Sequence, residues 1–190
     1  NGAKLPWKVV DGVKVFHLVA EEVDHQFAPG LSARCWGYNG RVHGPLIEAV
    51  EFDRVRIYVT NRLPEATTVH WHGLLLPNGM DGVGGLNQKA IQPGETFKYE
   101  FTIHQSGTNM YHAHHDEMTQ MGLGMTGLFI THPPRPRHPA VDRDFALLLH
   151  QWRSHPVSKP PNPQQVPHST ARPLAAPPFP GPAPPRAHPR

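Results

Sequence analysis

Two histidine pairs, each with one residue between its members, constrain this chain more than any other feature of the sequence. His70 and His72 follow the β-branched run TTV, and His112 and His114 follow NMY. Residues i and i+2 of a strand point to the same face, about 6.5–7 Å apart, so each pair directs two imidazoles the same way. The pattern therefore predicts two neighbouring strands of one sheet that face a common site.

The chemistry of that site follows from its ligands. Strands pair about 4.8 Å apart, so four imidazoles spread over two strands are too widely spaced for one tightly held ion. They suit several ions held close together. Neutral imidazole favours copper, zinc, iron or nickel over calcium and magnesium. One such pair is a weak indication of a metal site, whereas two pairs with suitable surroundings are a strong one.

Other segments predict strands separated by turns. Residues 13–20 and 55–60 are rich in β-branched side chains, and 97–103 alternates apolar with polar residues. The turn sequences YNG, PNG and QPG separate such segments. Many short strands joined by Gly and Pro turns are typical of a Greek-key sandwich or barrel. We therefore expect an all-β fold.

Composition excludes several classes of protein. The net charge of +3 is divided, since residues 1–132 hold 10 Lys and Arg against 13 Asp and Glu, while 133–190 hold 8 against 2. No basic stripe with interleaved aromatics is present, so we expect no nucleic-acid partner. No apolar run approaches about 18 residues, so we expect no membrane span. The single cysteine, Cys35, excludes an internal disulfide, and we expect it to be a small buried hydrophobe.

The character of the chain changes after Trp152. Residues 145–152 look like a further strand, but 154–190 hold 13 prolines in 37 positions and no Asp or Glu. Such a stretch cannot bury enough apolar surface to fold, so we expect it to be disordered. Its Pro, Arg, Ala and His content is typical of an out-of-frame reading of GC-rich DNA. We expect a frameshift after about Arg153, and a genuine proline-rich interaction tail is the alternative.

Between about residues 13 and 152 the chain resembles the first domain of the multicopper oxidases, the laccase-like and copper-resistance-type enzymes. The motifs are ARCWGYNG at 33–40, DRVRIYVTNRL at 53–63, TVHWHG at 68–73, MDG at 80–82, IQPGET at 91–96, GTNMYHAH at 107–114 and GMTGLFI at 124–130. HWHG and YHxH in this order are highly specific. The resemblance implies a Greek-key cupredoxin domain over 1–134, then a linker and the first strand of a missing second domain over 135–153.

The resemblance also implies roles for the four histidines. His70 would bind a type 2 copper, and the type 3 copper pair would be bound by His72, His112 and His114. A type 1 blue copper needs a cysteine ligand. Ala113 stands between the second pair of histidines, where some cupredoxin domains have cysteine, so we expect no type 1 site in this chain.

The residues beside the four histidines allow several functional interpretations. The resemblance implies that Asp81 helps to deliver the protons that dioxygen reduction consumes, and the alternative is an Asp that caps the turn before Gly82. Trp71 and Tyr111 alternate with the histidines and should pack in the core rather than relay electrons. His115 is out of phase with its neighbours and should face away from the cluster.

The remaining histidines and methionines carry weaker predictions. Four histidines lack paired spacing, and we expect them to be surface or hydrogen-bonded residues: His17, His25, His43 and His104. Three methionines would suit copper(I), but their context favours packing beside the site: Met118, Met121 and Met125.

Three functions follow from this sequence. We expect the N-terminal part of an oxidase that supplies half of the trinuclear-cluster ligands for four-electron reduction of dioxygen to water, coupled to oxidation of a phenol or a metal ion. The intact enzyme would need further cupredoxin domains and would be periplasmic or otherwise exported, although no signal peptide precedes Asn1 and we take this end to be processed or truncated. The 190-residue chain alone should be inactive. A non-catalytic copper-binding module is the alternative, and a cupin is disfavoured because Glu117 follows His114 too closely.

Overall fold

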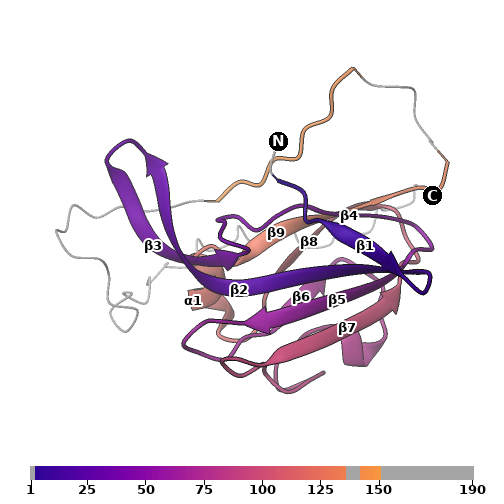
Figure 1. The fold of residues 1–190 in the computed structure, drawn as a ribbon, viewed down its shortest axis with the longest axis horizontal. Helices are drawn as coiled ribbons and strands as arrows, with labels where there is room; N and C mark the ends of the chain where they lie inside the picture. Colours follow the sequence, from indigo (N-terminus) through magenta and orange to yellow (C-terminus); the bar gives the residue numbers. More distant parts are fainter. Residues whose placement is uncertain (1–2, 136–141, 151–190) are drawn as a thin grey trace, which may run out of the picture. The chain divides into compact units, whose positions relative to one another are not determined.

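Alternation of apolar and polar side chains folds this chain into two β-sheets that enclose one core (Figure 1). The computed structural model describes residues 3–135 and 142–150. Its elements are β1 (Trp7–Val10), β2 (Val13–Ala28), β3 (Leu31–Tyr38), β4 (Ile47–Val50), β5 (Arg54–Asn61), β6 (Val69–His72), η1 (Asn78–Met80), β7 (Thr96–Thr102), β8 (Gly107–Ala113), α1 (Glu117–Gly122) and β9 (Thr126–His132). The predicted all-β class is confirmed.

Each sheet combines parallel and antiparallel pairs. One sheet has the order β1-β2-β5-β7, with β3 paired to β2, and the other has the order β4-β9-β8-β6. The pairs β2/β5 and β4/β9 are parallel, and the remaining ladders are antiparallel. The first part of β2 pairs with β5, and its last part forms with β3 the long hairpin seen projecting in Figure 1.

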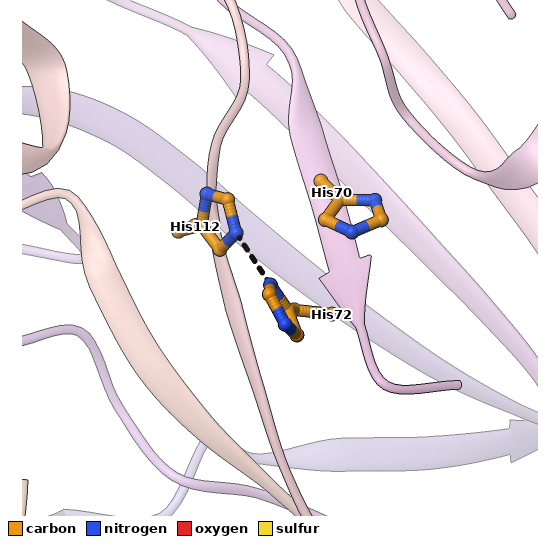
Figure 2. Close-up of side chains that lie close together, drawn as sticks. All are labelled: His70, His72 and His112. Carbon is orange, nitrogen blue, oxygen red and sulfur yellow. Dashed lines mark hydrogen bonds between the residues drawn. The ribbon is translucent and has the colours of Figure 1, made fainter. Parts of the chain in front are cut away.

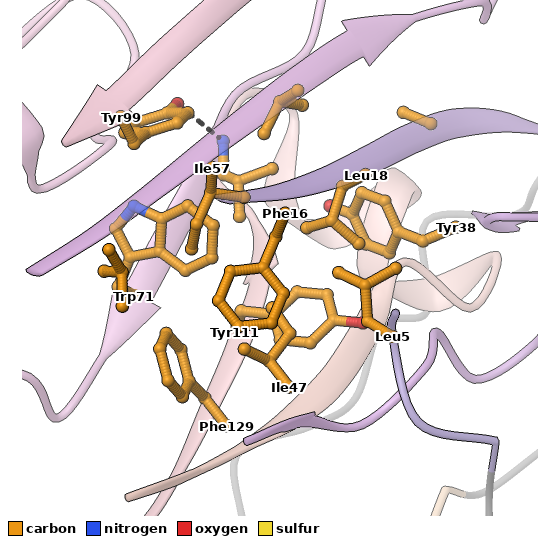
Figure 3. Packing of buried hydrophobic residues seen from close by; sticks show 14 of the residues in the cluster. Leu5, Phe16, Leu18, Tyr38, Ile47, Ile57, Trp71, Tyr99, Tyr111 and Phe129 are labelled. Carbon is orange, nitrogen blue, oxygen red and sulfur yellow. Dashed lines mark hydrogen bonds between the residues drawn. The ribbon is translucent and has the colours of Figure 1, made fainter. Parts of the chain in front are cut away.

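The core is centred on aromatic rings from both sheets (Figure 3). The Trp71 ring centroid lies 5.1 Å from that of Tyr99 and 6.1 Å from that of Phe129. The Tyr111 ring packs where Gly127 has no side chain, and its hydroxyl donates to a main-chain carbonyl at 2.6 Å. Trp71 and Tyr111 are both fully buried, which confirms that they pack in the core.

Most predicted strands are present, and the later segment differs. The segments 13–20, 55–60 and 97–103 form parts of β2, β5 and β7. Residues 142–150 form no strand, because they have no strand partner among the described residues. Residues 151–190, including the proline-rich stretch, lie outside the described residues.

Two smaller predictions can also be checked. Cys35 is buried, as expected, and its thiol lies 3.6 Å from the carbonyl oxygen of Ala33. Within 3–135 and 142–150, no helix has the length and apolar character needed to cross a membrane.

One carboxylate on the outer face of the β5/β7 pair is held by three cations. Arg56 Nε lies 2.7 Å from one Glu100 oxygen and Arg54 Nη2 lies 2.6 Å from the other. Lys98 Nζ lies 3.6 Å from the same carboxylate. The hydrogen bond from Arg56, with the positive charges around it, lowers the pKa of Glu100 from 4.5 to about 2.

Replacement of this carboxylate should change the pH dependence of folding. Glu100 is deprotonated more readily in the folded chain, so its contribution is complete above the unfolded pKa of 4.5 and is lost as pH falls toward about 2. Glu100→Gln should therefore unfold at lower urea concentration than the wild type at pH 7, and the difference should narrow below pH 4.5. Glu65→Gln, at an exposed position, is the control. A difference that stays constant across this range would contradict the assignment.

Candidate metal centre

The register of β6 and β8 places four histidines on one face. His70 lies opposite His112 in the antiparallel ladder, and His72 follows two residues along β6. His114 lies just beyond β8, where its main-chain N–H donates to the main-chain carbonyl of Thr68 at 3.3 Å. Directly paired residues of a ladder share a face, so all four imidazoles lie opposite the buried core side.

The four rings form a tight group around His70. Its ring centroid lies 5.4 Å from that of His72 and 5.3 Å from those of both His112 and His114. The His112 and His114 centroids lie 5.8 Å apart. The structure thus brings together the four histidines that the sequence pattern predicted to meet.

Two of these rings present nitrogens to each other. His72 Nδ1 and His112 Nε2 lie 3.2 Å apart, and a dashed line marks this contact in Figure 2. The ligand atoms of His70, His72 and His112 all lie within 4.8 Å of one another. A metal–imidazole bond is about 2.0–2.1 Å long, so the facing nitrogens are close enough to share one ion.

Main-chain carbonyls fix two of the rings. His70 Nδ1 lies 2.7 Å from the carbonyl oxygen of Asp81, and His112 Nδ1 lies 2.9 Å from that of Ala113. A carbonyl can only accept, so Nδ1 carries the hydrogen in both rings. The Nε2 atoms are then left with a lone pair for a metal, which is the common arrangement of metal-binding histidines.

Burial keeps the most enclosed ring neutral. His112 is only 3% exposed, and desolvation lowers its pKa below the ordinary 6.5, with the nearby His70 adding to the effect. The hydrogen bond to Ala113 opposes this shift in part. The neutral ring is the form that binds metal, so His112 is suited to be a ligand at neutral pH.

Asp81 lies beside His70 and is held there by the turn that follows η1. One carboxylate oxygen lies 3.5 Å from His70 Nδ1. Gly82 adopts a positive φ of 84°, and a Cβ at this position would lie 1.8 Å from the carbonyl oxygen of Val69. Only glycine allows this close approach to β6. The main-chain N–H of Asp81 also donates to the Asn78 carbonyl, so the turn-capping and proton-delivery interpretations both remain predictions.

The exposure of other residues near the site agrees with the predictions at some positions and differs at one. His115 is exposed, and that it faces away from the cluster stays a prediction. Met125 is fully buried and Met121 is partly buried, but Met118 is 86% exposed, so the expectation that it packs beside the site is wrong. Met118 lies on α1, a helix of six residues that is too short to bury every apolar side chain it carries. Glu117 lies 3.5 Å from His114 Nε2.

Two glutamines that the sequence did not single out hold the ends of β6. Buried Gln120 of α1 accepts from the Thr67 hydroxyl at 2.7 Å and donates to the Ala66 carbonyl at 2.8 Å. At the other end, Gln105 accepts from Leu75 N–H and donates to the Gly73 carbonyl. The partners of Gln120 lie more than 50 residues away in the chain, so no local pattern marks it.

Comparison with known proteins gives a family. The family model described as "Multicopper oxidase" matches residues 19–136. Copper resistance protein A of Escherichia coli is 40% identical over 114 residues, which cover 60% of this chain and 18% of that protein. L-ascorbate oxidase of Cucurbita pepo var. melopepo is 37% identical over 147 residues, 73% of this chain and 26% of that protein. The chain thus spans about a fifth to a quarter of the length of these relatives.

Comparison with solved structures also finds multicopper oxidases. A multicopper oxidase from Pseudomonas thermotolerans matches with a TM-score of 0.63 and 37% identity, over 65% of this chain and 31% of that chain. The blue copper oxidase from Nitrosomonas europaea matches with a TM-score of 0.60 and 35% identity, over 64% and 39%. The expected cupredoxin-like sandwich is confirmed by this similarity.

Loss of Gln120 should destabilise the strand that carries the first histidine pair. Gln120→Leu keeps the approximate volume but leaves the Thr67 hydroxyl and the Ala66 carbonyl without their buried partner, which should cost about 1–3 kcal/mol of unfolding free energy. Gln105→Leu is the matched control, because water can reach the groups that it frees. Urea denaturation of the two variants compares them. An equal or larger loss for Gln105→Leu would contradict the role assigned to Gln120.

Proposed function

This chain belongs to the multicopper oxidase family, and on that basis we propose that it is the N-terminal cupredoxin domain of an oxidase and supplies half of the ligands of a trinuclear copper cluster. The observation that carries the proposal is the four-histidine face of β6 and β8. Its donor set fits copper, because all four ligands are imidazoles and main-chain carbonyls engage Nδ1 in two of them, which turns Nε2 toward the common face.

Each histidine has a proposed role. His70 binds the type 2 copper through Nε2, and the type 3 pair is bound by His72, His112 and His114. The 3.2 Å separation of His72 Nδ1 and His112 Nε2 supports a copper shared by these two rings. No type 1 copper is proposed here, because Ala113 cannot bind metal and Cys35 lies buried on β3 of the other sheet.

Copper at this face would supply electrons to dioxygen, and the residues of the chain arrange that chemistry. Main-chain carbonyls hold the His70 and His112 rings in one tautomer, so no reorientation is needed when a ligand binds. The Asp81 carboxylate lies at the edge of the face, is 33% exposed, and can hold a proton between solvent and the cluster. We assign Asp81 the delivery of protons to reduced oxygen.

The face is half of a site. His72 is exposed, and His70 and His114 are only partly buried, so the described residues leave the face open to further ligands. We propose that the remaining ligands and the type 1 copper come from other cupredoxin domains of an exported, periplasmic oxidase. Dioxygen and a small reducing substrate or metal ion would be its reactants. A non-catalytic copper-binding module is the alternative, favoured by the same open face, and oxidase turnover by a complete protein that contains this domain distinguishes the two.

Copper binding by the 190-residue chain should depend on the second histidine pair. Replacement of His112 and His114 by alanine removes two ligands and should abolish Cu²⁺ binding at this face, whereas His115→Ala should leave it nearly unchanged. Electron paramagnetic resonance of copper-loaded chain measures this. The visible absorption spectrum should lack the intense blue band of a cysteine-bound centre, and the chain should not consume dioxygen. Copper affinity that depended on His115, or oxidase turnover by this chain, would contradict the proposal.

The proposed role of Asp81 can be separated from copper binding. Asp81→Asn retains the main-chain carbonyl that accepts from His70, so copper binding should persist. In a complete oxidase that contains this domain, the variant should consume dioxygen more slowly and with an altered pH profile, while reduction of the protein by its electron donor stays unchanged. Asp11→Asn in the turn after β1 is the control. Unchanged turnover in Asp81→Asn would favour the turn-capping interpretation.

A further inference from the structure

Two other histidines meet outside the four-histidine face. His43 lies in the loop between β3 and β4, and His150 lies in the segment 142–150. His43 Nε2 and His150 Nδ1 are 3.2 Å apart, and the two rings are nearly parallel, with 8° between their planes. These residues are 107 positions apart in the chain, so their contact is a product of tertiary structure.

One member of the pair, His43, lines a hollow with room for a ligand. Its volume is about 460 Å³, and His25 from the projecting hairpin also lines it. The other lining side chains include Val42 and Leu148, and none of the lining residues is acidic. Arg41 is the one lysine or arginine among them, and it is exposed. The donors available at this hollow are therefore imidazole nitrogens.

Charge and burial keep the two rings neutral. Desolvation lowers the pKa of His43, and the neighbouring His150 and His25 lower it further. Desolvation also lowers the pKa of His150. Two neutral imidazoles with nitrogens 3.2 Å apart have two options: one N–H···N hydrogen bond, or two lone pairs directed at one cation.

The spacing fits the second option. Two bonds of about 2.05 Å to nitrogens that lie 3.2 Å apart enclose an angle of roughly 100°, close to that of a tetrahedral zinc site. Imidazole nitrogen without carboxylate selects zinc, copper or nickel over calcium and magnesium. We propose that His43 and His150 form a second metal site for a divalent ion of this class, with water completing its coordination. The ion would fasten segment 142–150 to the loop before β4.

Zinc titration tests the site separately from the copper face. The parent for this test is the 190-residue chain with His112→Gln and His114→Gln, and Zn²⁺ binding is measured by calorimetry. The parent should still bind Zn²⁺, and added His43→Gln or His150→Gln should remove that binding. His17→Gln, whose ring contacts the Thr60 hydroxyl elsewhere on the sheet, should retain it. No Zn²⁺ binding in the parent, or binding unaffected by His43→Gln, would overturn the proposal.

A second measurement needs no change at the copper face. Arg143 is an exposed trypsin site in the segment that the ion would fasten. Zn²⁺ should slow cleavage after Arg143 in the wild-type chain and in His17→Gln, but not in His43→Gln. Circular dichroism of each variant verifies that the sheets remain folded. Equal cleavage of wild type with and without Zn²⁺ would show that the histidine pair is a hydrogen bond only. This result is independent of copper binding by the other four histidines.

Discussion

The pairing register of β6 and β8 is the constraint on which the rest of this structure depends. It places His70 opposite His112 and, on the other side of the sheet, Trp71 opposite Tyr111. A slip of β6 by one residue would reverse its faces, moving the Trp71 ring into water and the imidazoles of His70 and His72 into the core. The aromatic packing of the sandwich therefore holds the histidine face in place, and the same alternation encodes both core and site.

Neighbouring groups then limit the freedom of each ring. Gln120 and Gln105 hold the two ends of β6, and the close approach at Gly82 sets the turn that contains Asp81. Main-chain carbonyls orient the His70 and His112 rings, so half of the face is organised by the protein alone. Preorganisation of this kind keeps ligand geometry independent of the bound ion.

The features that could be predicted from the sequence are those that depend on local residue patterns. Strand alternation gave the sandwich, and the spacing of His70, His72 and their later counterparts gave the four-histidine face. Prediction failed for interactions whose two members are far apart in the sequence or in which one member is a main-chain group. Nothing near Gln120 marks its bonds to residues 66 and 67, and nothing in the spacing of His43 points to His150. The strand expected over 145–152 depends on a pairing partner, which a single segment cannot specify.

The carbonyl that orients His70 has a consequence for how this domain tolerates change. The acceptor belongs to the main chain of residue 81, so every amino acid at that position presents the same oxygen. Ring orientation is thus insulated from point substitution there, while the carboxylate is free to vary. The intolerant position is the adjacent glycine, where any Cβ would collide with β6. Mutational drift could alter the acidity of this edge of the face without disturbing the direction of its first ligand.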